Sequence, residues 1–162
     1  MPKVYVSIGS NINREVNLQL AITTLRERYE SVELSPVYET PSVGFDGDPF
    51  YNLVAGFEDD RPVESVIQTL QDIEAGCGRD RSAPKFGSRS IDLDIILYGD
   101  LIRHDESVRL PRPELLKYNF MLKPLVDLVP HLVHPELNKT LAECGIEYLS
   151  STLDYREIEI EF

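Results

Sequence analysis

The sequence lacks any run of 18 or more apolar residues, which argues against a transmembrane helix. Its first residues, MPKVYVSIGSN, alternate apolar and polar side chains, a pattern typical of a strand rather than of the apolar core of a signal peptide. Cysteine is scarce, with only Cys77 and Cys144 and no C-x-x-C motif. These two could form one disulfide, but free thiols in a reducing cytosol are favoured. We therefore expect a cytoplasmic protein, with residues 1–162 in one domain.

Positive charge is also in short supply, since 16 basic residues face 28 acidic ones and the net charge is −12. Such a surface repels nucleic acid and anionic membranes, so neither is expected as a partner. One local exception is the cluster of Arg79, Arg81, Lys85 and Arg89, in which Asp80 is the one acidic residue. We expect any anion-binding site to include this cluster.

Several motifs of nucleotide-binding and hydrolytic enzymes are absent. There is no G-x-x-x-x-G-K-[ST], no G-x-G-x-x-G and no G-x-S-x-G, which disfavours P-loop proteins, protein kinases, dinucleotide-binding folds and α/β-hydrolases. His131-x-x-His134 could begin a zinc site, but neither cysteine is near in sequence. We interpret this pair, flanked by Pro130 and Pro135, as a surface connection.

Hydrophobic periodicity predicts an alternation of strands and helices. The apolar residues of the helices recur at spacings of three and four, whereas those of the strands recur every second position. The expected strands are 3–8, 32–38 (interrupted or ended by Pro36), 52–58 and 91–98. The expected helices are 16–29, a second one with Asp59 or Asp60 as its cap, Pro62 in its first turn and an end at Gly76 and Gly78, and 120–129. Residues 40–50 and 79–90 are predicted loops that could act as lids, and residues 155–162 could add an edge strand or remain a tail.

The order strand, helix, strand, strand, helix, strand is that of a ferredoxin-like β-α-β-β-α-β core. We therefore predict an α+β fold with a mainly antiparallel sheet and helices packed on it.

The predicted strand 91–98 carries two carboxylates on one face. Alternation places Asp92 and Asp94 with Ile96 and Tyr98, whereas Ile91, Leu93, Ile95 and Leu97 face the other way. The two aspartates are then roughly 6.5–7 Å apart at their α-carbons. They could form the solvated face of an edge strand, paired with arginines. The preceding basic cluster favours a different interpretation, in which cationic side chains hold a polyphosphate and Mg²⁺ joins it to the carboxylates.

Residues 85–95, KFGSRSIDLDI, resemble the signature of the 6-hydroxymethyl-7,8-dihydropterin pyrophosphokinase family of folate synthesis. Further segments resemble the family in the same order, so that the resemblance spans roughly residues 3–135. These segments are 8–11, 38–44, 50–52, 73–81 and 120–125.

The resemblance implies transfer of pyrophosphate from ATP to the hydroxymethyl group of a pterin, with two Mg²⁺ ions. It implies that Asp92 and Asp94 hold the metal ions and that Arg79 and Arg89 stabilise charge on the moving phosphates. It implies nucleotide contacts from Gln71, Glu74, Arg81, Lys85, Ile95 and Arg112. It implies pterin contacts from Thr40, Pro41, Val43, Gly44, Asn52, Phe120 and an aromatic of the pair Phe50 and Tyr51. From the pattern alone, core packing is the favoured role of Phe50, Tyr51 and Phe120.

The chain departs from the family pattern at four places. Lys85-Phe86 stands where the family shows Arg-Trp, and Ser88 replaces a proline. Arg112 stands where the family usually has the histidine of a Pro-His-Pro motif, and Tyr118 stands where the family usually has an arginine. Two alternatives to a pyrophosphokinase stay open. One is a non-catalytic relative that binds pterin or nucleotide as a regulatory module, and the other is an unrelated ferredoxin-like interaction domain. A monomer or weak homodimer is expected.

Overall fold

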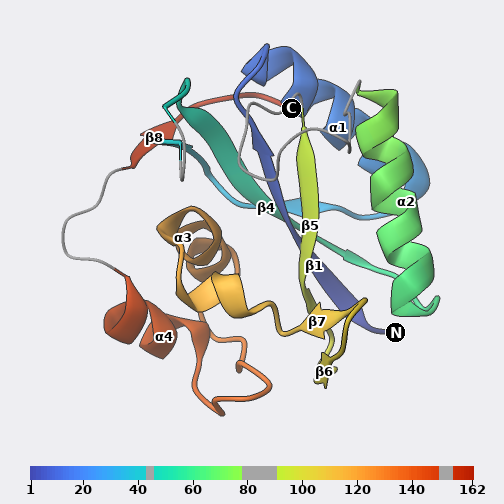
Figure 1. Ribbon diagram of the computed structural model, residues 1–162, viewed down its shortest axis with the longest axis vertical. Helices are drawn as coiled ribbons and strands as arrows, with labels where there is room; N and C mark the ends of the chain where they lie inside the picture. The colour runs from blue at the N-terminus through green and yellow to red at the C-terminus, as the bar shows by residue number, and fades with distance from the viewer. Residues whose placement is uncertain (43–45, 78–90, 150–154) are drawn as a thin grey trace.

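A six-stranded antiparallel sheet forms the centre of the protein (Figure 1). The computed structural model describes residues 1–42, 46–77, 91–149 and 155–162. The strand order is β5-β1-β4-β3-β8, and β2 also pairs with β4. The strands are β1 (Lys3–Ser10), β2 (Glu33–Leu34), β3 (Val37–Thr40), β4 (Phe50–Glu58), β5 (Asp92–Tyr98) and β8 (Arg156–Ile158). This order confirms the predicted ferredoxin-like core.

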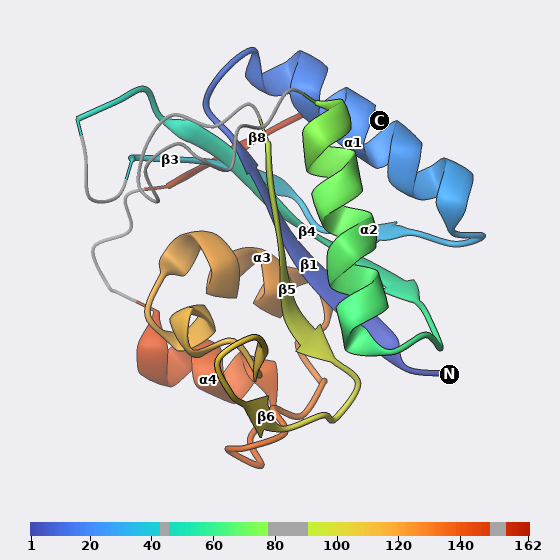
Figure 2. The same ribbon diagram turned by 45° about the vertical axis from the view of Figure 1, so that its right-hand side comes forward.

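Two helices, α1 (Arg14–Arg28) and α2 (Val63–Gly76), cover one face of the sheet (Figure 2). The inward side chains of α1 recur at helical spacing, and Leu18, Ile22 and Leu25 are essentially unexposed. They pack against every second residue of the central strands, such as Val4 of β1 and Phe57 of β4. The predicted helix over 16–29 is thereby confirmed within two residues at each end, and the second predicted helix is confirmed with Pro62 as its N-cap.

A smaller helical layer covers part of the opposite face. It contains the short 3₁₀ helix η1 (Pro113–Leu116), α3 (Asn119–Leu128) and α4 (Leu141–Tyr148). A two-stranded ribbon, β6 (Arg103–His104) and β7 (Arg109–Leu110), lies at the lower edge in Figure 1. Helix α4 was not predicted, although Thr140 and Glu143 form a capping box at its start. No helix in the described ranges is long and apolar enough to span a membrane.

The strand predicted over 32–38 is divided at Pro36, as its missing N–H requires. Ser35 bridges the gap, because its backbone N–H donates to the Val54 carbonyl (2.9 Å) and its hydroxyl accepts from the Val54 N–H (2.8 Å). The C-terminal segment does join the sheet, since β8 pairs with β3 along Val37↔Ile158 and Glu39↔Arg156. Beyond β8 the chain remains against α1, where the Gln19 amide donates to the Glu161 carbonyl at 2.5 Å.

A β-bulge in β5 corrects the predicted alternation of that strand. Tyr5 of β1 pairs with Leu97, but the next residue, Val6, pairs with Ile95, so Ile96 is the extra residue. The prediction is right as far as Ile96, which lies on the face of the two aspartates, and wrong for Leu97 and Tyr98. Leu97 packs in the core beneath α3, and Tyr98 packs on the α1–α2 side.

Cys77 and Cys144 are both free thiols, as expected. Cys144 is buried in the core between the sheet and the α3–α4 layer.

Candidate active site

Polar residues gather at one end of the sheet, on the face that α3 covers further along. Gly9 of β1 pairs with Asn52 of β4 on one side and with Asp92 of β5 on the other. Directly paired residues point to the same face of a sheet. Val54 and Asp94 follow two positions later on their strands, and Val54 belongs to the core beneath α3. The strands therefore bring Asn52, Asp92 and Asp94 together on one face.

The two aspartates form a crowded acidic pair. Burial raises the pKa of Asp94 well above its usual range, and the neighbouring charge of Asp92 raises it further. Glu74 of α2 adds to this effect, whereas Arg112 opposes it. The Glu74 side chain is fully buried, and its Oε2 accepts a hydrogen bond from the Leu93 N–H at 2.9 Å. This concentration of negative charge favours a cation next to Asp94.

Arg112 is fixed at the bulge of β5. Its Nε donates to the Ile95 carbonyl at 2.9 Å, and its backbone N–H donates to the Ile96 carbonyl at 3.0 Å. The guanidinium is thereby held near Asp94, where its charge acts on that carboxyl. The Ile95 side chain is buried in the core beneath α1 and α2, so a nucleotide contact from this residue would have to come from its backbone.

Asn52 and Thr40 form a second polar group on the same face. The Asn52 Nδ2 donates to the Thr40 Oγ1 at 2.5 Å, and both side chains are buried. Gly9 leaves room for this amide, because a Cβ at Gly9 would lie 2.6 Å from the Asn52 Oδ1. A fixed amide on a buried face is suited to reading the donors and acceptors of a planar heterocycle.

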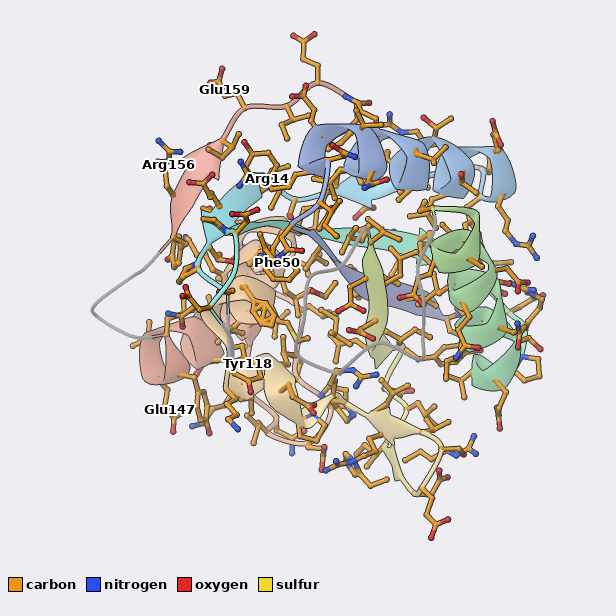
Figure 3. The ribbon with its side chains drawn as sticks, turned by 45° about the horizontal axis from the view of Figure 1, so that its top comes forward. Arg14, Phe50, Tyr118, Glu147, Arg156 and Glu159 are labelled. Carbon is orange, nitrogen blue, oxygen red and sulfur yellow. The ribbon has the colours of Figure 1, made fainter. Side chains whose placement is uncertain are left out.

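The aromatic pair of β4 is divided between the two faces. Phe50 shares the face of Asn52, two positions away, whereas the Tyr51 ring packs on the α1 side beneath the Arg14 guanidinium at 3.8 Å. Phe120 lies in the first turn of α3, and the centroid of its ring is 5.1 Å from the centroid of the Tyr118 ring. In Figure 3, Phe50 and Tyr118 both lie beside α3. Phe50, rather than Tyr51, is thus the aromatic of the pair on the side of the acidic residues.

Comparison with known proteins decides which family this site belongs to. The family model of 7,8-dihydro-6-hydroxymethylpterin-pyrophosphokinase (HPPK) matches residues 5–130. The chain belongs to the HPPK family.

Individual relatives of the HPPK family agree with this membership. The 2-amino-4-hydroxy-6-hydroxymethyldihydropteridine pyrophosphokinase of Aquifex aeolicus is 32% identical over 145 residues, covering 88% of this chain and 90% of that protein. The folic acid synthesis protein fol1 of Pneumocystis carinii is 37% identical over 142 residues. That match covers 86% of this chain and 19% of the fungal protein, so the chain spans about a fifth of that relative.

A solved structure supports the same fold. The crystal structure of wild-type Plasmodium falciparum HPPK-DHPS superposes with a TM-score of 0.68 at 13% sequence identity. The match covers 98% of this chain and 48% of that one.

Not all of the site residues that the HPPK resemblance implies are found at this end of the sheet. Some lie elsewhere in the fold, and others lie outside the described residues. Gln71 is half-buried on α2, one turn before Glu74, and Pro41 is exposed just after β3. Six of the expected site residues lie outside the described residues, and they are Val43, Gly44, Arg79, Arg81, Lys85 and Arg89. Their roles stay predictions.

Two residues near the HPPK site were missed by sequence reasoning. Ser7 is buried and pairs with Asp94 across β1 and β5, which the alternation of β1 could have indicated. Arg14 contacts the ends of the connection between β3 and β4, and no sequence spacing signals a contact over this separation.

Proposed function

We propose that this chain transfers the pyrophosphoryl group of ATP to the hydroxymethyl oxygen of 6-hydroxymethyl-7,8-dihydropterin and releases AMP. The observation that supports the proposal is the row Asn52–Gly9–Asp92, in which an amide suited to the pterin and a carboxylate suited to metal-bound phosphates lie on the two strands that flank β1. Membership of the HPPK family supports the same reaction, with ATP as co-substrate.

The acidic pair fits Mg²⁺. Asp92 and Asp94 offer hard oxygen ligands, and the raised pKa of Asp94 shows that burial and its acidic neighbours disfavour the charged carboxylate unless a cation is near. Among the described residues, no group of three or more histidine, cysteine, aspartate or glutamate side chains is placed to hold a metal. Two carboxylates would leave the remaining positions to phosphate oxygens and water, as Mg²⁺ prefers. When bound, two such ions would offset the charge of the transferred phosphates.

The residues of the chain supply position rather than a covalent nucleophile. The Asn52–Thr40 pair is placed to orient the pterin edge, and Phe50 and Phe120 are suited to its flat faces. In the transfer, the hydroxymethyl oxygen forms a bond to the β-phosphorus and loses its proton. The bond between the β-phosphorus and the oxygen that bridges it to the α-phosphorus breaks, and AMP leaves with the electron pair. Holding the two reactants in this geometry provides most of the acceleration expected of such a site.

The deciding experiment is nucleotide analysis after mixing the protein, ATP, Mg²⁺ and the pterin alcohol. AMP and the pterin pyrophosphate are the expected products, and both should be absent without the pterin. Formation of ADP would reject the proposal. Tight pterin binding with no product would instead favour the non-catalytic alternative.

Substitution of the acidic pair tests its role. Asp92→Asn and Asp94→Asn should each lower kcat by about a hundredfold to a thousandfold, because each removes one ligand of the phosphate-bound metal. The melting temperature of the metal-free Asp94→Asn protein should stay the same or rise, since the substitution relieves the crowding of like charges. Asp100→Asn, at an exposed turn after β5, is the matched control and should keep full activity. Loss of the fold in both site variants would indicate a structural role instead.

A further inference from the structure

Arg14, the first residue of α1, joins both ends of the connection between β3 and β4. Its Nη1 donates to the Glu39 Oε2 at 2.9 Å and to the Pro49 carbonyl at 3.2 Å. Its guanidinium also lies over the Tyr51 ring at 3.8 Å. Glu39 and Tyr51 are directly paired across the two strands. The Arg14 side chain therefore contacts both members of one strand pair, and also the residue that precedes β4.

The pterin-facing residues lie on the other side of the same strands. The pair of Glu39 and Tyr51 has one neighbouring pair on each side along the strands. Thr40 pairs with Phe50 on one side, and Tyr38 pairs with Asn52 on the other. Successive residues of a strand point to opposite faces, so Arg14 contacts the back of the surface that carries Thr40, Phe50 and Asn52 on its front. In Figure 3, Arg14 lies on the α1 side of this end of the sheet and Phe50 lies on the side towards α3.

Two other contacts act on the same region but differ from that of Arg14. Asn11 donates from its Nδ2 to the Asp48 carbonyl at 3.2 Å. Arg156 of β8 donates to the Glu39 Oε1 at 2.9 Å, but its side chain is 71% exposed, against 27% for Arg14. The hydrogen bond from Arg14 is the largest cause that lowers the pKa of Glu39. Arg156 thus shares the anionic partner of Arg14 without reaching across to β4.

We propose that Arg14 is a positioning residue for the pterin, which holds the ends of β3 and β4 in the register that presents Thr40, Phe50 and Asn52. This inference rests on the proposed function. An exposed ion pair would contribute little, because water screens the two charges and ordering two long side chains costs entropy. Arg14 differs because its planar guanidinium is partly buried, stacks on an aromatic ring and links two strand ends at once.

The test compares Arg14→Gln with Arg156→Gln, since both substitutions remove one cationic partner of Glu39. Steady-state AMP release is measured while either the pterin or ATP is varied, and thermal melting checks the fold. Arg14→Gln should raise the KM for the pterin about tenfold and change the KM for ATP less than about twofold. Arg156→Gln should leave both within about twofold of the unmodified chain.

A pterin KM that stays unchanged in Arg14→Gln, or an equal rise of both KM values, would overturn the positioning role. If Arg14→Gln does not melt cooperatively, Arg14→Lys replaces it, because lysine keeps the charge but not the stacked planar group. A rise of about threefold in the pterin KM is then expected, and no rise would refute the role.

The unmodified chain separates this inference from the proposed function. If it releases no AMP, the proposed function is rejected, and calorimetric titration with the pterin alone decides the role of Arg14. A pterin Kd about tenfold weaker in Arg14→Gln would support the role, and an equal Kd would overturn it. Failure of the unmodified chain to bind pterin would overturn both.

Discussion

Replacing Gly9 with alanine should weaken pterin binding without unfolding the protein. Gly9 lies between Asn52 and Asp92 in the central row of the sheet. A Cβ at this position would lie 2.6 Å from the Asn52 Oδ1, which is 0.8 Å less than the 3.4 Å at which ordinary contact begins. The amide cannot move freely, because its Nδ2 is bonded to the Thr40 hydroxyl at 2.5 Å. Gly9→Ala must therefore rotate the amide or separate the strands.

The size of the effect follows from these two outcomes. Inserting a methyl group into a well-packed site costs about 1–3 kcal/mol. If the amide rotates, the hydrogen bonds that it offers to the pterin are lost, and each is worth roughly 1 kcal/mol or more. We expect the Kd for the pterin to rise about tenfold to a hundredfold. The melting temperature should fall by roughly 2–12 °C, at about 2–4 °C for each kcal/mol in a chain of this length.

Isothermal titration calorimetry with 6-hydroxymethyl-7,8-dihydropterin measures the Kd, and circular dichroism measures the melting curve. Gly76→Ala is the matched control, because a Cβ at this last residue of α2 would meet no atom within 4 Å in the described residues, apart from its chain neighbours and the backbone of α2 itself. It should keep the pterin Kd and melt at the same temperature or slightly higher. A folded Gly9→Ala protein that binds the pterin as tightly as the unmodified chain would refute the assignment of Asn52 to the pterin.

Two further predictions concern stability and pH. Burial alone would raise the pKa of Asp59, but hydrogen bonds from Arg61 and Tyr29 outweigh it and lower the pKa from 3.8 to about 2. Above pH 4 this carboxylate therefore adds about 2 kcal/mol to the free energy of unfolding, and the contribution is lost as the pH falls towards 2. Urea unfolding of Asp59→Asn should lack this contribution. Burial lowers the pKa of His134 below 6.5, and its Nδ1 accepts the backbone N–H groups of residues 136 and 137, so the free energy of unfolding should fall as the pH drops below 6.5.

The controls for these two predictions use the same urea titrations. Asp59→Asn should be less stable than the unmodified chain at pH 7, and the difference should shrink between pH 4 and pH 2. His134→Asn offers an Oδ1 acceptor that does not titrate, and it should remove the loss of stability between pH 6.5 and 5.5. A loss of equal size in His134→Asn would assign the effect to another group.

The fold was largely predictable because its elements follow simple periodicities. Alternation in β1 and β4 and helical spacing in α1 and α2 gave the order of the ferredoxin-like core. The shared face of Asp92 and Asp94 followed from the same alternation. Helix α4 was missed because it is only one eight-residue segment, although its capping box was present in the sequence.

The remaining details depend on pairing between distant segments. The bulge at Ile96 exists only because β5 is paired with β1, and no pattern within β5 indicates it. The choice of Phe50 over Tyr51 depends on which of them shares a face with Asn52, once β4 is placed in the sheet. The contact of Arg14 with the far end of β3 joins segments that are adjacent only after folding.

Backbone hydrogen bonding sets the distance between the pterin side and the metal side of the proposed site. Asn52 and Asp92 are separated by one intervening strand, which fixes their α-carbons at roughly 10 Å. Insertions in surface connections, or fusion to other domains, would leave this interval unchanged. A region similar to this chain accordingly makes up 90% of the Aquifex relative and only 19% of the Pneumocystis one.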